Sequence, residues 1–272
     1  DFALSISGGA AGVNATPASI TKTAQNIWVL GLTLTGGTAN GSETLTVNPA
    51  AGTAIYDKAG NAASTSQSNN TASLTEKILP TITDVTSTTG NGSYKQGQTI
   101  AITVEFSEAV NVDESGGTPT LTLNNTSGTN PAVNYSSGSG STTLTFNYTI
   151  GSGETSGDLD YVTTSSLVLN SGTIKDAALN AATLTLASPG ATNSLRANKD
   201  LIVDTSVPTI SSVSLNAANS ELTVTFAEDV YNTNGGSGDL EVADFALSIS
   251  GGAAGVNATP GSITKTAQNI WV

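Results

Sequence analysis

The chain has 272 residues, of which 8 are basic and 21 are acidic, and it contains no histidine, cysteine or methionine. Without histidine and cysteine it has no thiol nucleophile, no serine–histidine pair, and none of the usual ligands of zinc, copper and haem. Its formal charge of −13 argues against nucleic-acid and anionic-membrane partners, because both require a basic surface.

Export and membrane signals are missing from this sequence. The longest apolar run, residues 27–32, is far too short to span a bilayer. No signal-like segment opens the chain, so we expect any export signal to lie outside it. The lack of cysteines fits either a reducing compartment or a secreted bacterial protein that folds without disulfides.

Apolar residues alternate with threonine in several short runs along the chain. In chain order the clearest runs are 100–106, 121–123, 144–148 and 222–226. A period of two residues is typical of half-buried strands, and no stretch has a convincing helical period. The sequence therefore predicts an all-β protein.

The two ends of the chain repeat each other. Residues 1–29 and 244–272 are identical except that Gly261 replaces Ala18. Such near-identity indicates a recent tandem duplication with a period of 243 residues, and hence a longer parent array. We therefore expect the chain to be a segment of a longer polymer.

A weaker repeat divides this period in two. The tripeptide PTI opens two segments, at 80 and 208, in which ITVEFSEAV (102–110) resembles LTVTFAEDV (222–230). Likewise, IKDAALN (174–180) resembles IYDKAGN (55–61). We interpret 80–207 as a complete module B, 1–79 as the C-terminal part of a module A, and 208–272 as the N-terminal part of the next module A.

The size and turn spacing of each module predict an immunoglobulin-like β-sandwich. Seven or eight short strands are separated by turns rich in Gly, Asn and Ser, although the Cys…Trp…Cys pattern of antibody domains is absent. Trp28 and Trp271 occupy the same repeat position, and we expect both to pack in a core rather than to form a ligand platform.

Three motifs resemble a known repeat type: TFAEDV and VEFSEAV after the PTI opening, SGSGSTTLTFNYTIGSGETSGDLDY, and GTIKDAALNAATLTL. They are similar to the Ig-like tandem repeats of giant bacterial surface adhesins, in particular the swimming-motility-associated repeats of cyanobacteria and gliding bacteria. The resemblance implies a stalk in a surface filament used for gliding adhesion or for grappling prey. Leu179 stands where that family usually carries Gly, so the sequence does not predict a left-handed turn there.

Carboxylates gather at the predicted domain ends. In a seven-stranded sandwich, the loop after the second strand and the loop before the last strand lie at the end where the chain enters. Module B places Glu108 at the end of its second strand, Asp176 and Asn180 in its late loop, and Glu76 in the entering linker. The corresponding residues of module A are Asp204, Glu228, Asp229, Asp57 and Asn61.

Oxygen ligands from three segments suit calcium, which accepts six to eight oxygens in flexible geometry. Calcium at a linker would neutralise these acids and fix the angle between neighbouring domains. The alternative is that each Asp or Asn serves only its own turn. Asp158 and Asp160 invite a glycosidase interpretation, but no aromatic cleft accompanies them, and we expect a solvated strand edge or a lesser calcium ligand instead.

These observations favour a structural repeat, a stalk or filament segment of a very large extracellular bacterial adhesin. We expect neighbouring repeats and other copies of the chain as its partners, in a homo-oligomeric filament at the cell surface, and no enzymatic activity. The alternative is a glycan- or ligand-binding Ig-like module, which would need a suitable cleft in every copy.

Overall fold

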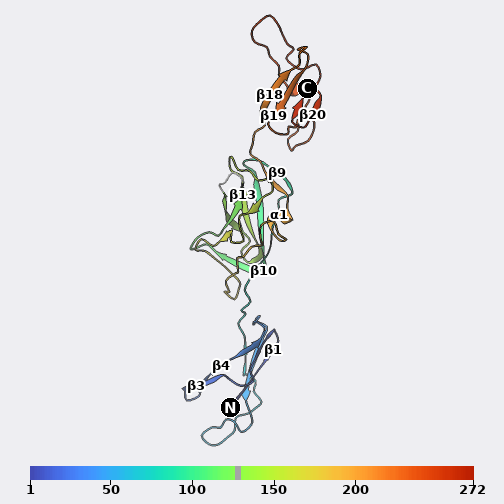
Figure 1. Cartoon of the computed structure of the whole chain (residues 1–272). Helices are drawn as coiled ribbons and strands as arrows, with labels where there is room; N and C mark the ends of the chain where they lie inside the picture. The colour runs from blue at the N-terminus through green and yellow to red at the C-terminus, as the bar shows by residue number, and fades with distance from the viewer. Residues whose placement is uncertain (126–129) are drawn as a thin grey trace.

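The computed structural model describes residues 1–125 and 130–272. It forms three bodies in line, with the N-terminus in one outer body and the C-terminus in the other (Figure 1). Nearly all of the regular structure is β-strand, which confirms the predicted all-β class. The sequence did not predict the single helical turn α1 (Leu195–Asn198), capped by the Ser194 hydroxyl, or the 3₁₀ turn η1 (Val242–Asp244).

The N-terminal body holds three small antiparallel sheets. Strand β1 pairs with β6 and β6 pairs with β7, while β2 pairs with β5 and β3 with β4. The bounds are β1 (Phe2–Ser7), β2 (Ala11–Val13), β3 (Ser19–Ala24), β4 (Ile27–Gly31), β5 (Leu34–Gly36), β6 (Thr44–Pro49) and β7 (Thr71–Ser73).

The central body contains the main hydrophobic core of the chain. Its buried residues run from Val85 to Val203, and the fully buried ones include Ile102, Leu144 and Phe146. Its strands are β8 (Ile82–Ser87), β9 (Gly92–Tyr94), β10 (Thr99–Asp113), β11 (Thr120–Asn124), β12 (Ala132–Ser137), β13 (Ser141–Thr149), β14 (Asp160–Tyr161), β15 (Leu167–Val168), β16 (Thr173–Lys175) and β17 (Leu201–Val203).

Alternation along the central strands explains how this core forms. Along β13 the side chains of Leu144, Phe146 and Tyr148 are buried, and the polar residues between them lie at or near the surface. Strand β10 pairs with β13 through Ile100↔Tyr148, Ile102↔Phe146 and Val104↔Leu144, so the apolar sets coincide. Each strand buries one face, as expected in an immunoglobulin-like β-sandwich.

The C-terminal body is a single antiparallel sheet in the order β18-β19-β21-β20. Its strands are β18 (Ile210–Leu215), β19 (Leu222–Phe226), β20 (Lys265–Ala267) and β21 (Ile270–Trp271). Both outer bodies bury few apolar side chains and expose many, whereas in the described part of the central body, residues 80–125 and 130–207, the exposed large ones are Val168, Leu179 and Val207.

Candidate metal-binding site at a joint

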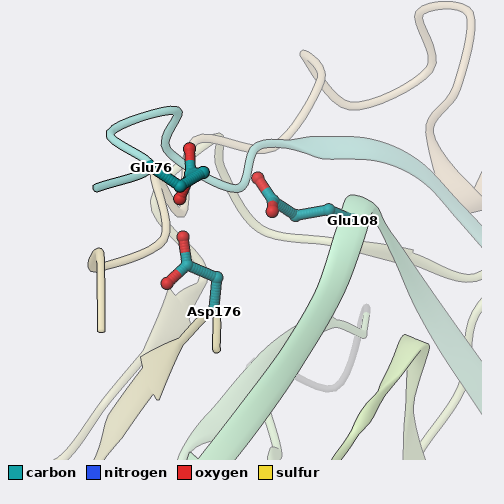
Figure 2. A group of neighbouring side chains, drawn as sticks. All are labelled: Glu76, Glu108 and Asp176. Carbon is teal, nitrogen blue, oxygen red and sulfur yellow. The ribbon is translucent and has the colours of Figure 1, made fainter. Parts of the chain in front are cut away.

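Glu108 lies where the long strand β10 changes partners. The first part of β10 pairs with β8 and β13, whereas Asn111, Val112 and Asp113 pair with β16. The register shifts between Glu105 and Val110, and this irregularity contains Glu108. The prediction that Glu108 ends the second strand is therefore wrong, because the strand continues to Asp113. The bulge turns the Glu108 side chain toward the entrance of the domain (Figure 2).

Asp176 and Asn180 hold a tight loop that begins directly after β16. Asp176 Oδ1 accepts a hydrogen bond of 2.8 Å from the Asn180 backbone N–H, and the Asp176 N–H donates to the Asn180 carbonyl at 3.1 Å. Leu179 has φ +70, so the left-handed turn forms without glycine. The matching loop after Asp57 has Gly60 at φ +88 and the same 2.8 Å bond from Asn61 N–H.

Glu76 belongs to the linker between the N-terminal and central bodies. Its neighbour Lys77 donates a backbone hydrogen bond of 2.8 Å to Ala39 in the N-terminal body. The Glu76 side chain reaches the central body, where Oε2 accepts a 2.5 Å hydrogen bond from the Asn180 amide. The same amide donates to the backbone carbonyls of Glu76 and Ile78, at 3.3 and 3.4 Å. This linker residue therefore joins the two bodies.

The carboxylates of Glu76, Glu108 and Asp176 converge, and Figure 2 shows them facing a common space. One oxygen of each lies within 4.8 Å of the other two. Calcium binds oxygens at roughly 2.3–2.6 Å, so ligands on opposite sides of one ion are about 5 Å apart. All three carboxylates can therefore reach a single calcium ion.

Burial and mutual repulsion shape the electrostatics of this cluster. Asp176 is 2% exposed, and Glu76 and Glu108 are partly buried. Loss of solvation, together with the charges of Glu76 and Asp176, raises the pKa of Glu108. Burial also acts to raise the pKa of Asp176, but hydrogen bonds from the Asn180 side chain and backbone outweigh it and hold that pKa below its usual value.

No salt bridge to these acids forms within residues 1–125 and 130–272. The two salt bridges found there, Arg196–Asp158 and Lys265–Asp239, both lie elsewhere. The cluster can offer a metal ion oxygen atoms alone. These are the three carboxylates, the nearby linker carbonyls and the side-chain oxygen of Asn180, once the Asn180 amide rotates to point its oxygen inward. This set fits a hard divalent cation better than a transition metal.

The acids predicted for module A are not brought together within one chain. Asp57 and Asn61 lie in the N-terminal body, and both are exposed. In the C-terminal body, burial and the charge of Asp204 raise the pKa of Glu228, while Asp229 is exposed. Two of the five predicted residues therefore lie in the N-terminal body, and the other three lie directly after β17 or in the C-terminal body.

Asp158 and Asp160 each contact neighbouring residues of the central body. Asp160 is 4% exposed, and its two oxygens accept backbone hydrogen bonds of 2.9 Å from Tyr161 and Gly190. Asp158 lies 3.4 Å from Arg196. The predicted solvated strand edge is thus wrong for Asp160, whose lone pairs hold a neighbouring loop in place.

Sequence reasoning missed Glu43, the most buried acid of the N-terminal body. Its Oε1 accepts backbone hydrogen bonds from Ala10 at 2.9 Å and Ala11 at 3.2 Å, and its Oε2 accepts one from Asn40 at 3.0 Å. Burial acts to raise the pKa of Glu43, but these bonds outweigh it and lower that pKa. The one sequence signal for this position is the turn-forming pair Gly41-Ser42 directly before it, which indicates a turn but not a buried carboxylate.

The β-sandwich that carries Glu108, Asp176 and Asn180 resembles a known protein family. Residues 76–188 match the family described as the bacterial Ig-like domain. This part of the chain is therefore similar to bacterial Ig-like domains, in agreement with its β-sandwich fold. The match begins at Glu76 and includes Glu108, Asp176 and Asn180, so all four residues of the cluster fall within the matched range.

No curated protein and no solved structure gives a significant match to the chain. Among the described residues, no helix has the length and apolar character needed to cross a membrane.

Proposed function

We propose that the chain is a stalk segment of a long bacterial surface protein, in which calcium fixes the joint between neighbouring Ig-like units. The observation that carries the proposal is the meeting of Glu76, from the linker, with Glu108 and Asp176 of the central domain. A cation held by residues from both sides of a joint restricts the angle between them.

The linker explains why such an ion would matter mechanically. Residues 74–80 form no strand or helix, and Pro80 removes one backbone donor where the central domain begins. Thr183 N–H donates to the Pro80 carbonyl at 2.8 Å at the far end of this segment, and Lys77 N–H donates to the Ala39 carbonyl of the N-terminal body at 2.8 Å. A cation at Glu76 would add a charged link between these two anchored points, so that pulling or bending forces pass from one body to the next.

The repeat supports a stalk role at the level of the whole array. Near-identity between 1–29 and 244–272 indicates a repeating unit, and we infer that each joint recurs along a longer parent chain. Stability in such arrays is local plus nearest-neighbour, so unit number can change without loss of folding. A bacterial Ig-like domain suits a surface protein, and we extend this to an extracellular adhesin or filament.

The composition and the described site support a non-enzymatic role. Histidine and cysteine are absent, and both oxygens of Asp160 serve as acceptors for backbone N–H groups. A glycan-binding module would need exposed aromatic rings in the central domain. Its rings Phe106, Phe146, Tyr148 and Tyr161 are instead buried, and Tyr94 and Tyr135 are partly buried, so we favour the stalk.

Isothermal titration with calcium tests the site, with Glu108→Gln as the variant and Glu105→Gln as its matched control. Glu105 lies on the same strand and is also partly buried, but it lies outside the cluster. We expect one calcium per chain for the wild type and for Glu105→Gln, and at least tenfold weaker binding for Glu108→Gln. Equal affinities for the two variants would refute this site.

A further inference from the structure

The last strand of the central body pairs with a strand near its beginning. Strand β17 runs parallel to β9, and all three residues of each strand are in register. Beyond the strands, Asp204 N–H donates to the Tyr94 carbonyl at 2.9 Å, and Gly92 N–H donates to the Asp200 carbonyl at 3.0 Å. Strand β9 lies at the end of the central body that faces the C-terminal body (Figure 1). The chain therefore leaves the central body alongside β9.

The other edge of β17 is bonded as well. Ser156 and Val203 exchange two backbone hydrogen bonds, both of 2.8 Å. Leu159 N–H donates to the Leu201 carbonyl at 2.9 Å. The side chains of Leu201 and Val203 are buried in the core, with 0 and 2% exposure. Strand β17 is therefore held on both edges and through its side chains, although it has only three residues.

The chain stays attached to the central body beyond the end of β17. The Thr205 hydroxyl donates a 3.0 Å hydrogen bond to the Glu154 carbonyl. Glu154 is itself fixed, because its Oε2 accepts hydrogen bonds from the buried Tyr148 hydroxyl at 2.7 Å and from Gly151 N–H at 2.6 Å. A pull on Thr205 is therefore resisted by the core through Glu154 as well as through β17.

Tension along a stalk pulls the central body at its two ends, at Pro80 and at Val207. The pull at Pro80 acts on β8 and, through residues 88–91, on β9, in the direction of the N-terminal body. The pull at Val207 acts on β17 in the direction of the C-terminal body. Because β9 and β17 are parallel neighbours, the two pulls act in opposite directions along one axis, and the evenly spaced hydrogen bonds between the strands are strained together. An antiparallel pair pulled from one end would instead open one bond at a time.

We propose that β9 and β17 form the force-bearing clamp of the central domain, so that forced unfolding begins when β17 slides past β9. The contact on the entry side is longer, because β8 has six residues against three in β17 and pairs with β10 at five positions. The shorter contact yields first and so sets the force that the domain withstands. The clamp rests on the stalk role proposed above, but it involves no calcium.

A nickel bridge between the two strands tests the clamp, because the chain has no histidine of its own and imidazole binds nickel. One variant carries Ser93→His with Ile202→His, at positions that lie opposite each other on β9 and β17. The matched control carries Thr120→His with Asn134→His, at opposite positions on β11 and β12. In each pair one residue is exposed and the other is partly buried.

The whole chain is stretched from its two ends in calcium-free buffer, with and without nickel. Unfolding of the central body is recognised by a length gain of roughly 40 nm, the extended length of residues 80–207. We expect nickel to raise the unfolding force by about half in the Ser93 and Ile202 variant, because its bonds must break before the strands slide. The force should stay the same in the control. Equal nickel effects in the two variants, or no effect in the first, would overturn the proposal.

Two core substitutions give a second test that needs no metal. Val203 in β17 is 2% exposed, and Val133 in β12 is 6% exposed. Each change to Ala removes buried apolar surface and should raise the unfolded fraction at equilibrium by about tenfold. Under constant force, Val203→Ala should raise the unfolding rate by about tenfold and Val133→Ala should barely change it, because contacts still intact at the barrier do not affect that rate.

Equal unfolding rates for Val203→Ala and Val133→Ala under force would contradict the clamp. Both force measurements are made without calcium, and no substituted residue belongs to the Glu76, Glu108 and Asp176 cluster. A negative result therefore refutes the clamp alone, and the joint site is judged by its own calcium titration.

Discussion

The Asn180 side-chain amide donates a 2.5 Å hydrogen bond to Glu76 Oε2 and thereby connects the central domain to the linker that enters it. The same amide bonds Asp176 Oδ2 at 2.8 Å, so one side chain spans two acids of the cluster. Removing it affects the loop and the joint together.

Replacing Asn180 by Ala should therefore destabilise the central domain by about 1–3 kcal/mol, the cost of leaving buried partners without their hydrogen bonds. Thermal unfolding followed by circular dichroism measures this effect. Asn61→Ala is the control, because Asn61 occupies the same loop position with an exposed side chain and reaches no linker. A larger loss for Asn61→Ala would contradict the assignment.

Glu108 should make the calcium-free domain more stable in mild acid. Its folded pKa is raised, so the stability it contributes is complete below the unfolded value of 4.5 and is lost as the pH rises through the folded pKa. Glu108→Gln should remove this pH dependence and raise stability at neutral pH by about 1 kcal/mol, since it removes one charge from a repelling set. Urea unfolding in EDTA across this pH range measures it. A Glu108→Gln chain with unchanged pH dependence would disprove the repulsion.

Glu43 should have the opposite pH dependence. Its folded pKa is lowered, so its contribution is present above the unfolded value of 4.5 and is lost as the pH falls through the folded pKa. Hydrogen exchange of the Ala10, Ala11 and Asn40 amides should accelerate at acid pH, relative to amides of the central core, once the known pH dependence of chemical exchange is corrected. Glu43→Gln should show the acceleration already at neutral pH. Unchanged protection in that variant would contradict the role of the carboxylate.

Leu179→Gly should stabilise the central domain by about 1 kcal/mol. A left-handed backbone costs an ordinary residue roughly 1–2 kcal/mol, and glycine avoids that cost but loses more entropy on folding. Leu179 is 75% exposed, so little apolar burial is lost. The reverse change, Gly60→Leu, provides the control at the matching loop and should destabilise the N-terminal body. A fall in melting temperature for Leu179→Gly would contradict this interpretation.

Part of this architecture could be read directly from the sequence. Alternation gave the central strands, because a buried face imposes a period of two on residues such as Leu144, Phe146 and Tyr148. The meeting of Glu76, Glu108, Asp176 and Asn180 followed from the alternation of loops between the ends of a sandwich. Both inferences require only the period of two along a strand and the alternation of loops between the two ends of a sandwich.

Other features depend on tertiary contacts that no local pattern records. Strand β10 continues past Glu108 because a second partner, β16, takes over its pairing. Leu179 adopts a left-handed backbone because Asp176 and Asn180 close the loop around it. Trp28 and Trp271 have the same sequence context but different exposure, because only Trp271 has β19 beside it.

The central claim is that calcium fixes the joint at Glu76, and a distance distribution across the joint tests it most directly. Spin labels at Thr53→Cys in the N-terminal body and Ser152→Cys in the central domain report it by pulsed electron paramagnetic resonance, because both positions are exposed. We predict a broad distribution in EDTA and a narrow one in calcium, with no narrowing when Glu108→Gln is added. Equal widths with and without calcium in the otherwise unchanged chain would contradict the claim.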